Sequence, residues 1–389
     1  MKKICFITTI QLTMDTFVVP FAKVLAENGY DVTYICNMDE EFPVRNGNYA
    51  KCIHLPMQRG FHFFDIFKFT NALIKIFKEE KFDAIYYATD NASFYSSIAG
   101  AIVKVPVRLY AQWGIHYVAA SGLSKLIMQI LEKTTCDFST VIRAQSPKNM
   151  QIALDDKLCK PTKIKVLGLG GTIGVDFSEY EFNRKKEFRK RIREKYALAE
   201  EDFIFGFVGR VNKDKGCIEL LKAFKTGGFP GNVKLMFVGM SDGCEGELAE
   251  LVGWAKQTDK VIFTGQVKGI EVCQYMSAFD IMVHPTYREG FGKVLQEGLA
   301  MGLPIITTDV PGPSEVIEEN ICGLLVPSQN INILQEKMHL LMQDEQLRES
   351  FSIAGRMRAE KFFERSKMIN NILVDLDEIL GVKRDENGV

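Results

Sequence analysis

The sequence predicts an α/β fold made of two Rossmann-like domains, each built on a parallel sheet. Short apolar, β-branched runs alternate with longer segments of helical spacing, which is typical of parallel strands covered by helices. This series occurs twice, and the glycine-rich stretch 168–176 separates the two occurrences. At 389 residues, the chain is long enough to form two hydrophobic cores.

Each series can be assigned to residue ranges. In the first half, we expect strands at 3–9, 31–36, 83–89, 107–112, 140–144 and 163–167. The segments between them, 16–28, 66–80 and 124–135, have amphipathic helical spacing. In the second half, we expect strands at 203–208, 233–238, 261–264, 280–284 and 304–307. These ranges predict domains at 1–175 and 176–365.

Composition excludes several classes of protein. The net charge is −1, so the overall charge gives no reason to expect nucleic-acid binding. Nine cysteines, without a Cys-x-x-Cys pair, indicate free thiols in a reducing cytoplasm rather than disulfides or zinc. No apolar stretch approaches 18 residues, and the first apolar run lacks a signal-peptide cleavage site. We therefore expect a cytoplasmic protein.

Two glutamates in the second half predict the chemistry. Glu289 follows an expected strand that ends in His284-Pro285, and Glu297 lies in an expected helix at about 292–301. Gly290 and Gly292 expose the amides at the helix start, and such amides attract phosphate. Carboxylates accept hydrogen bonds from hydroxyl groups. A phosphate site between two hydroxyl-binding acids predicts a sugar nucleotide.

Two cations upstream fit the same ligand. Arg210 and Lys215 follow the strand that ends at Gly209, where open parallel sheets bind ligands. Together with a helix start they can offset the charge of a diphosphate without a metal. The only Asp-x-Asp triplet, 375–377, lies in a helical segment and is expected to face solvent. We therefore expect no metal and no other cofactor.

These motifs carry a family resemblance. They are Gly-Arg-x-x-x-x-Lys-Gly at 209–216, Glu-Gly-Phe-Gly-x-x-x-x-Glu at 289–297, and further matches at 174–176, 301–308, 311–315 and 323–327. The chain resembles the retaining GT-B glycosyltransferases of the GT4 family, also called glycosyltransferase group 1. The resemblance is dense from about 203 to 327. It implies two Rossmann-like domains facing a central cleft, with a final helix in 366–389 that crosses back to the first domain.

The resemblance also implies roles for individual residues. Arg210 and Lys215 would hold the donor diphosphate, Glu289 would bind the transferred sugar, and Glu297 would bind the ribose. Glu315 matches a further acid of the family, or it caps a helix. The donor-binding set is completed by Gly290, Phe291, Gly292, Val294 and Leu295.

The first domain departs from the family pattern. Residues 8–14 replace the Gly-Gly pair that many relatives carry after the first strand. Trp113 stands where relatives have a histidine before a glycine. His116 is a candidate catalytic residue acting from a shifted position, and a structural histidine is an equal alternative. We expect His284 to be structural.

The implied activity is sugar transfer from a nucleoside-diphosphate donor, with uridine the commonest base, to a hydroxyl acceptor with retained anomeric configuration. The setting would be the assembly of a cell-surface polysaccharide or glycolipid, with a sugar or a lipid-linked acceptor. A sugar phosphorylase and a nucleotide-sugar epimerase are alternative activities on this fold. A non-catalytic binding subunit is the alternative from another class.

Two segments raise the question of membrane contact. Residues 184–195 contain eight basic and two acidic residues, which predicts either a solvated helix face or contact with an anionic membrane. Residues 61–69 mix phenylalanines with a lysine, which fits either a core-facing helix or a membrane-facing surface. Membrane contact would place the enzyme at the inner face of the plasma membrane.

Overall fold

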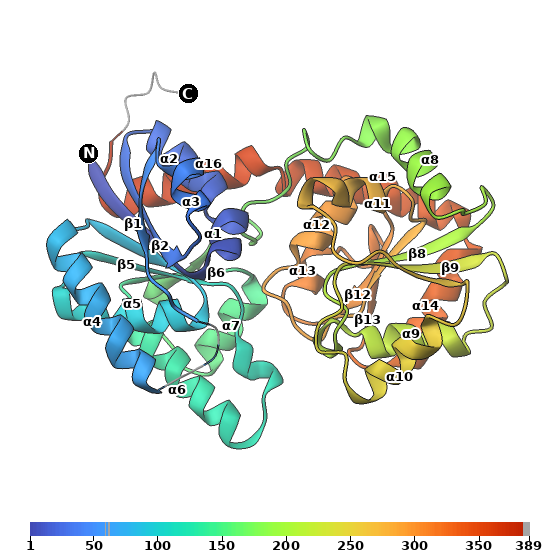
Figure 1. Ribbon diagram of the computed structural model, residues 1–389, viewed down its shortest axis with the longest axis horizontal. Coiled ribbons are helices and arrows are strands. Elements are labelled where there is room, and N and C mark those ends of the chain that lie inside the picture. The colour runs from blue at the N-terminus through green and yellow to red at the C-terminus, as the bar shows by residue number, and fades with distance from the viewer. Residues whose placement is uncertain (59, 61–62, 384–389) are drawn as a thin grey trace. The chain divides into compact units, whose positions relative to one another are not determined.

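The computed structural model describes residues 1–58, 60 and 63–383, and the chain divides into two compact units (Figure 1). Unit 1 comprises Met1–Ile173 and Ser366–Val389, and unit 2 comprises Gly174–Arg365. The nine cysteines, all within the described residues, are free thiols.

Unit 1 is built on a parallel sheet with the strand order β3-β2-β1-β4-β5-β6-β7. The edge strand β3 was not among the predicted strands, because a lysine and a histidine interrupt its apolar residues. The strands are β1 (Lys2–Ile10), β2 (Tyr30–Asn37), β3 (Ala50–His54), β4 (Ala84–Tyr87), β5 (Val107–Gln112), β6 (Val141–Ala144) and β7 (Ile164–Val166).

Helices cover both faces of this sheet. One apolar cluster joins α1, α2 and α16 to one face, and a second joins α4, α5 and α7 to the other. The segment 16–28, predicted as one helix, forms two, because the backbone turns at Val18 and Pro20 lies in the first turn of α2. The helices are α1 (Gln11–Phe17), α2 (Val19–Glu27), α3 (Glu41–Asn46), α4 (Phe63–Glu80), α5 (Asp90–Val103), α6 (Gly122–Phe138), α7 (Pro147–Asp155) and α16 (Arg365–Leu380), with 3-10 helices η1 (His116–Ala119) and η2 (Pro161–Lys163).

Unit 2 repeats this plan with the parallel strand order β10-β9-β8-β11-β12-β13. The strands are β8 (Phe203–Val208), β9 (Val233–Val238), β10 (Val261–Phe263), β11 (Ile281–His284), β12 (Ile305–Thr308) and β13 (Gly323–Val326). The helices are α8 (Lys185–Lys195), α9 (Cys217–Thr226), α10 (Gly246–Ala255), α11 (Val272–Met276), α12 (Lys293–Ala300), α13 (Pro313–Val316), α14 (Ile331–Gln343) and α15 (Glu345–Phe362), with η3 (Phe182–Arg184), η4 (Lys213–Lys215) and η5 (Gly269–Glu271).

The final helix α16 corrects one prediction. Asp375 and Asp377 were expected to face solvent, but both are buried. Asp375 accepts two hydrogen bonds from Arg143, at 2.7 and 2.8 Å, and Asp377 accepts one from the Tyr30 hydroxyl group at 2.6 Å. A buried carboxylate needs such partners to offset its desolvation. The Asp-x-Asp triplet therefore fixes α16 on unit 1.

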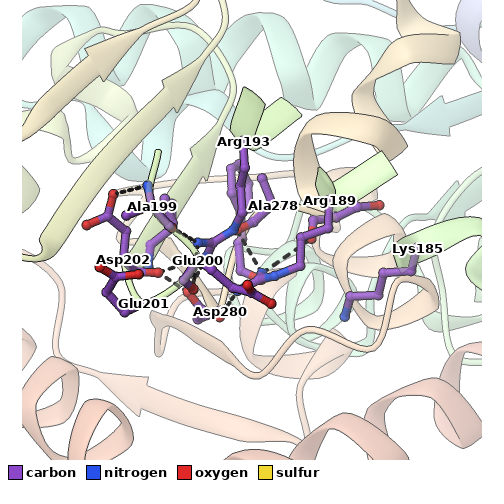
Figure 2. Close-up of polar contacts among 12 residues, drawn as sticks. Lys185, Arg189, Arg193, Ala199, Glu200, Glu201, Asp202, Ala278 and Asp280 are labelled. Atoms are coloured by element: carbon purple, nitrogen blue, oxygen red, sulfur yellow. Dashed lines mark hydrogen bonds and ion pairs between the residues drawn. The ribbon is translucent and has the colours of Figure 1, made fainter. Parts of the chain in front are cut away.

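The basic segment 184–195 agrees in part with the predicted solvated face. Most of it forms α8, and Arg189 and Arg193 turn inward toward backbone carbonyl groups (Figure 2), as does Lys185. Lys186, Lys190, Arg191 and Lys195 are exposed. The inward contacts are Lys185 Nζ to Met301 O (2.8 Å), Arg189 to Ala278 O (2.9 Å) and Asp280 (2.7 Å), and Arg193 to Ala199 O (2.6 Å) and Asp202 O (2.8 Å).

The segment 61–69 was the other candidate for membrane contact, and from Phe63 it forms the start of α4. Phe64 and Phe67 are exposed, whereas Phe61 and His62 lie outside the described residues.

Candidate active site

The predicted donor residues lie at the carboxyl edge of the unit 2 sheet. Strands β8 and β11 are neighbours, although β9 and β10 lie between them in the sequence. Strand order reverses between such neighbours, and ligands of open parallel sheets bind at that point. The segment with η4 follows β8, and the segment 285–292 follows β11. Both segments therefore meet where a ligand is expected.

Hydrogen bonds fasten these two segments together. Asp214 accepts a hydrogen bond from the Tyr287 amide through its carbonyl oxygen at 2.8 Å, and another from Arg288 through its carboxylate at 2.7 Å. Gly216 has φ +70°, and a Cβ there would lie 1.9 Å from the Pro285 carbonyl oxygen. Only glycine allows this approach. The contacts fix the distance between the two segments.

Lys215 and Glu289 form an ion pair across this junction. Their side chains are only 19% and 18% exposed, so water screens the pair weakly. Burial raises the pKa of the Glu289 carboxyl group, but the charge of Lys215 and a hydrogen bond from His284 outweigh burial and lower the pKa to about 2. The structure thus brings together one predicted cation and one predicted acid.

His284 belongs to the same cluster, and sequence reasoning assigned it only a structural role. Its ring is buried, stacks on Phe207, and places Nε2 3.2 Å from Glu289 Oε1. Burial lowers the pKa of the imidazole more than Glu289 raises it. A neutral ring can donate through Nε2 to the carboxylate. The signal in the sequence was its position at the end of β11, five residues before Glu289.

Glu297 and the start of α12 follow Glu289 in the sequence. Glu297 is buried and pairs with Lys293, one helical turn earlier. Burial raises the pKa of the Tyr180 phenol, and the charge of Glu297 raises it further. Gly292 has φ +94° and caps the helix, so the first free amides of α12 follow it directly. Of the other predicted donor residues, Phe291 and Leu295 are buried, whereas Gly290 and Val294 are half-buried.

Arg210 and Glu315 have other partners. Arg210 is half exposed and forms its ion pair with Asp242 at 2.6 Å, not with Glu289. Glu315 accepts a hydrogen bond from the Gly312 amide at 2.8 Å, which caps α13. Of the two roles considered for Glu315, the structure shows the capping contact.

A second polar cluster lies at the carboxyl edge of the unit 1 sheet, and it contains His116. His116 Nδ1 lies 2.5 Å from Asp90 Oδ2, and both residues line a cavity of about 60 Å³. Glu132 of α6 lines the same cavity and accepts hydrogen bonds from the Tyr110 hydroxyl group at 3.0 Å and the Gln112 amide at 2.7 Å. Sequence reasoning missed Asp90 and Glu132, because neither lies in a motif.

The Glu132 carboxyl group has an unusual environment. Burial raises its pKa to about 7, because the hydrogen bonds from Gln112 and Tyr110 compensate only part of the desolvation. The nearby charge of Asp90 raises this pKa further, and His116 lowers it. A carboxyl group with such a pKa exchanges its proton near neutral pH.

The segment 8–14, which replaces the family's Gly-Gly pair, comprises the end of β1 and the start of α1. β1 runs directly into α1 at Gln11, and the hydroxyl groups of Thr9 and Thr89 lie 2.7 Å apart. Trp113 is half-buried and packs against Phe17 of α1 at 5.4 Å between ring centroids. Trp113 therefore fills space between elements of unit 1, while His116 reaches the cavity.

Two further properties concern the described residues only. Within them, no group of three or more His, Cys, Asp and Glu side chains is arranged to hold a metal ion. No helix in the described part of the chain has both the length and the apolar character needed to cross a membrane.

Comparison with known proteins identifies the family. The model of glycosyl transferases group 1 matches residues 188–358, and the glycosyl transferase 4-like model matches residues 3–146. The capsular polysaccharide biosynthesis glycosyltransferase CapM of Staphylococcus aureus is 30% identical over 342 residues, 87% of each chain.

Solved structures show the same fold. HepE from Anabaena, in complex with UDP and glucose, superposes with a TM-score of 0.80 at 18% identity and covers 97% of this chain and 100% of its own. Sucrose-phosphate synthase from Thermosynechococcus elongatus has a TM-score of 0.80 at 19% identity, with 98% and 100% coverage. With its two parallel-sheet units and these matches, the chain has the GT-B fold and belongs to the GT4-like glycosyltransferases of group 1.

Proposed function

We propose that this glycosyltransferase moves a sugar from a uridine-diphosphate donor to a hydroxyl acceptor, with retained anomeric configuration and without a metal. The observation that carries the proposal is the Lys215–Glu289 ion pair between the segments after β8 and β11. It places a cation and a carboxylate where a parallel sheet receives a ligand. HepE, which shares the fold, was solved with UDP and with UDP-glucose, which supports the choice of donor.

Different residues of unit 2 bind different parts of the donor. Lys215 and the first amides of α12 take the diphosphate, because both supply positive charge. Glu289, ionised at neutral pH, accepts hydrogen bonds from sugar hydroxyl groups and stabilises positive charge that develops at the anomeric carbon. Glu297 binds the ribose hydroxyl groups after Lys293 moves aside. Arg210 leaves Asp242 for the diphosphate.

The transfer needs no reactant other than the donor and the acceptor. The acceptor oxygen forms a bond to the anomeric carbon, and the bond from that carbon to the diphosphate oxygen breaks on the same face. The acceptor proton passes to the leaving diphosphate, whose charge Lys215 offsets. The cavity with His116, Asp90 and Glu132 in unit 1 receives a hydroxyl group of the acceptor, because these side chains can accept and donate hydrogen bonds.

The setting we propose is the assembly of a cell-surface polysaccharide or glycolipid, since CapM, the relative that aligns over most of the chain, is named for capsular polysaccharide biosynthesis. The acceptor is then a sugar or a lipid-linked sugar.

The test begins with a thermal-shift screen of nucleotide sugars, followed by transfer from the radiolabelled donor it selects. Glu289→Ala is expected to abolish transfer and to leave UDP affinity within about threefold, because it frees Lys215 for the phosphate. Glu250→Ala, an exposed acid on α10, is the matched control and keeps full transfer.

Three outcomes would contradict the proposal. Unchanged transfer in Glu289→Ala removes the role of that residue. Loss of UDP binding in EDTA removes metal independence. Rapid conversion of the donor sugar without any acceptor identifies an epimerase instead of a transferase.

A further inference from the structure

A groove in unit 2 lies at the amino edge of its sheet. Asp280 and Pro304 line the groove, and each directly precedes a strand, β11 or β12. Glu289 follows β11, so the predicted donor residues lie at the opposite edge. The volume of the groove is about 820 Å³, which is within the range of small-molecule sites. The groove is therefore a candidate site for a second ligand, separate from the donor.

Positive charge exceeds negative charge in the lining of this groove. Four basic residues from helices α8 and α15 line it, together with two acids. The carboxylate of Asp280 already has partners within unit 2, because it accepts hydrogen bonds from Arg189 and from the Ile204 amide, each at 2.7 Å. The lining thus favours an anionic ligand. The basic residues are Lys185, Lys186, Arg189 and Arg348, and the acids are Asp280 and Glu349.

The environment of Lys185 reflects the same excess of positive charge. Burial lowers the pKa of its ammonium group to about 8, and the charge of Arg189 lowers the pKa further. Asp280 raises this pKa, but by less than Arg189 lowers it, and Arg356 adds to the lowering. An anion in the groove would stabilise the charged form of Lys185.

Two cations of α8 can donate to such a ligand. Lys186 is exposed, and it has no ion-pair partner in the part of the chain that the structure describes. Arg189 contacts the Ala278 carbonyl group through Nη1 and Asp280 through Nη2, yet its side chain is 31% exposed (Figure 2). The guanidinium group has five N–H donors, so donors are left for a ligand. An ammonium beside a guanidinium group suits phosphate.

The rest of the lining suits an organic group attached to the phosphate. Ile353 is 65% exposed and supplies apolar surface, as does the half-buried Phe182. Asn183 and Glu349 are exposed, and their side chains can form hydrogen bonds with hydroxyl groups. A sugar ring has apolar C–H groups and several hydroxyl groups. Together with the cations, this lining fits a sugar phosphate.

Helix α12 connects the groove to the predicted donor residues. Lys185 Nζ donates to the carbonyl groups of Met301 at 2.8 Å and Gly302 at 3.4 Å, directly after the carboxyl end of α12. The same helix carries Glu297, the acid assigned to the ribose. A phosphate in the groove would attract Lys185 and weaken its contact with this end of α12. A change at one end of the helix would thus reach Glu297.

We propose that the groove binds a sugar phosphate and that its occupation changes the affinity of the donor site. The phosphate contacts Lys186 and Arg189, and the sugar lies toward Ile353. The coupling to the donor rests on the proposed function, whereas binding in the groove does not. The sugar phosphate acts as an effector, because the groove and the donor residues lie at opposite edges of the sheet.

Calorimetric titration of the full chain tests the binding. The probes are fructose 6-phosphate and inorganic phosphate, added with UDP present to occupy the donor site. Wild type is expected to bind both, and the sugar phosphate more tightly. Lys186→Glu is expected to weaken binding at least about tenfold, because an attractive charge becomes a repulsive one. Ile353→Glu, on a different helix, is expected to weaken it at least about threefold for the same electrostatic reason.

The controls make the same changes one helical turn later, outside the groove. Lys190→Glu on α8 and Met357→Glu on α15 change exposed residues that do not line the groove, and both are expected to bind like wild type. Equal weakening in a variant and its control would overturn the proposal, as would absence of binding by wild type. Binding to phosphatidylglycerol vesicles, lost in Lys186→Glu, without binding of either soluble probe would assign the groove to a lipid headgroup and also overturn it.

UDP affinity with and without fructose 6-phosphate tests the coupling. Direct competition at the donor site would affect wild type and Lys186→Glu equally, so the difference between them measures the coupling. We expect a change of at least about threefold in wild type and none in Lys186→Glu. Equal changes in both would refute the coupling. Failure of wild type to bind UDP would refute the donor site alone, because titration of the groove variants without UDP still reports on the groove.

Discussion

Glu289 in unit 2 and Glu132 in unit 1 are enclosed carboxyl groups at the carboxyl edges of two similar sheets, yet their pKa values shift in opposite directions. Burial raises both pKa values. At Glu289 the charge of Lys215 outweighs burial and lowers the pKa to about 2, whereas Glu132 has mainly the neutral donors Gln112 and Tyr110 and reaches about 7. The sign of the shift is therefore set by the charge of the partner.

This difference suits the two proposed tasks. A carboxylate that supports a cationic transition state must remain ionised throughout the physiological range. A group that binds an acceptor hydroxyl group can accept or donate a hydrogen bond when its pKa lies near neutral pH. Similar sheets thus provide different electrostatic environments through a few side chains that follow the strands.

The largest expected effect comes from removing the cation. Lys215→Met should lower transfer turnover by about 10²–10³-fold, because the leaving diphosphate loses its positive partner. It should also raise the pKa of Glu289, which would then be buried without a cation. Initial rates at saturating donor measure the first effect. Lys256→Met, at an exposed position after α10, is the control. A similar loss of turnover in this variant would contradict the role of Lys215 at the leaving diphosphate.

A pair of isosteric substitutions tests the comparison directly. Glu132 has a folded-state pKa raised above its ordinary value of 4.5, so its contribution to stability is complete below about pH 4.5 and is lost as the pH rises to about 7. Glu132→Gln mimics the protonated form. It should stabilise the protein by up to about 3 kcal/mol at about pH 8 and by much less at about pH 5.

Glu289→Gln should have the opposite sign. The folded-state pKa of Glu289 is lowered, so its contribution is present above about pH 4.5 and is lost as the pH falls to about 2. At about pH 8 the variant should therefore be less stable than wild type, by about 3 kcal/mol. Scanning calorimetry of both variants at two pH values measures this. Shifts of the same sign would refute the comparison.

The sequence predicted more of the proposed donor site than of the proposed acceptor site, and the reason is physical. Lys215 and Glu289 each follow a strand end, and parallel strands bring such positions to one edge, so local spacing was sufficient. Glu132 lies inside a helix, and its partners Tyr110 and Gln112 come from a strand about twenty residues earlier. No local pattern reveals that contact, because it depends on how α6 packs.

The sequence also did not predict which face of each helix packs against the core. Both α6 and α8 have clear helical periodicity, but periodicity does not state which face meets the core. Arg189 and Arg193 turn inward because carbonyl groups near Ala278 and Ala199 need donors, and several apolar side chains in the amino-terminal half of α6 turn outward. The strands of both units were predicted, except for the edge strands β3 and β13.

A smaller effect is expected from the histidine beside Glu289. His284→Leu should lower turnover about tenfold, because a hydrogen bond to a charged group contributes about 1.5–3 kcal/mol. UDP affinity should not change, since the ring contacts the acid and not the cation. His284→Gln, which keeps a donor, should restore part of the turnover. Equal loss in both variants would indicate that the ring is needed only for packing against Phe207.

The smallest effect concerns Arg210, the predicted cation that the structure places outside the Lys215–Glu289 cluster. Its ion pair with Asp242 is about half exposed, and exposed pairs contribute about 0.2–1 kcal/mol. Asp242→Ala should release Arg210 for the diphosphate and tighten UDP binding about two- to threefold. Calorimetric titration with UDP measures this, and adding Arg210→Ala should cancel the gain. Weaker binding in Asp242→Ala would mean that Asp242 itself contacts the nucleotide, so that the donor side, like the acceptor side, uses an acid that no sequence motif marks.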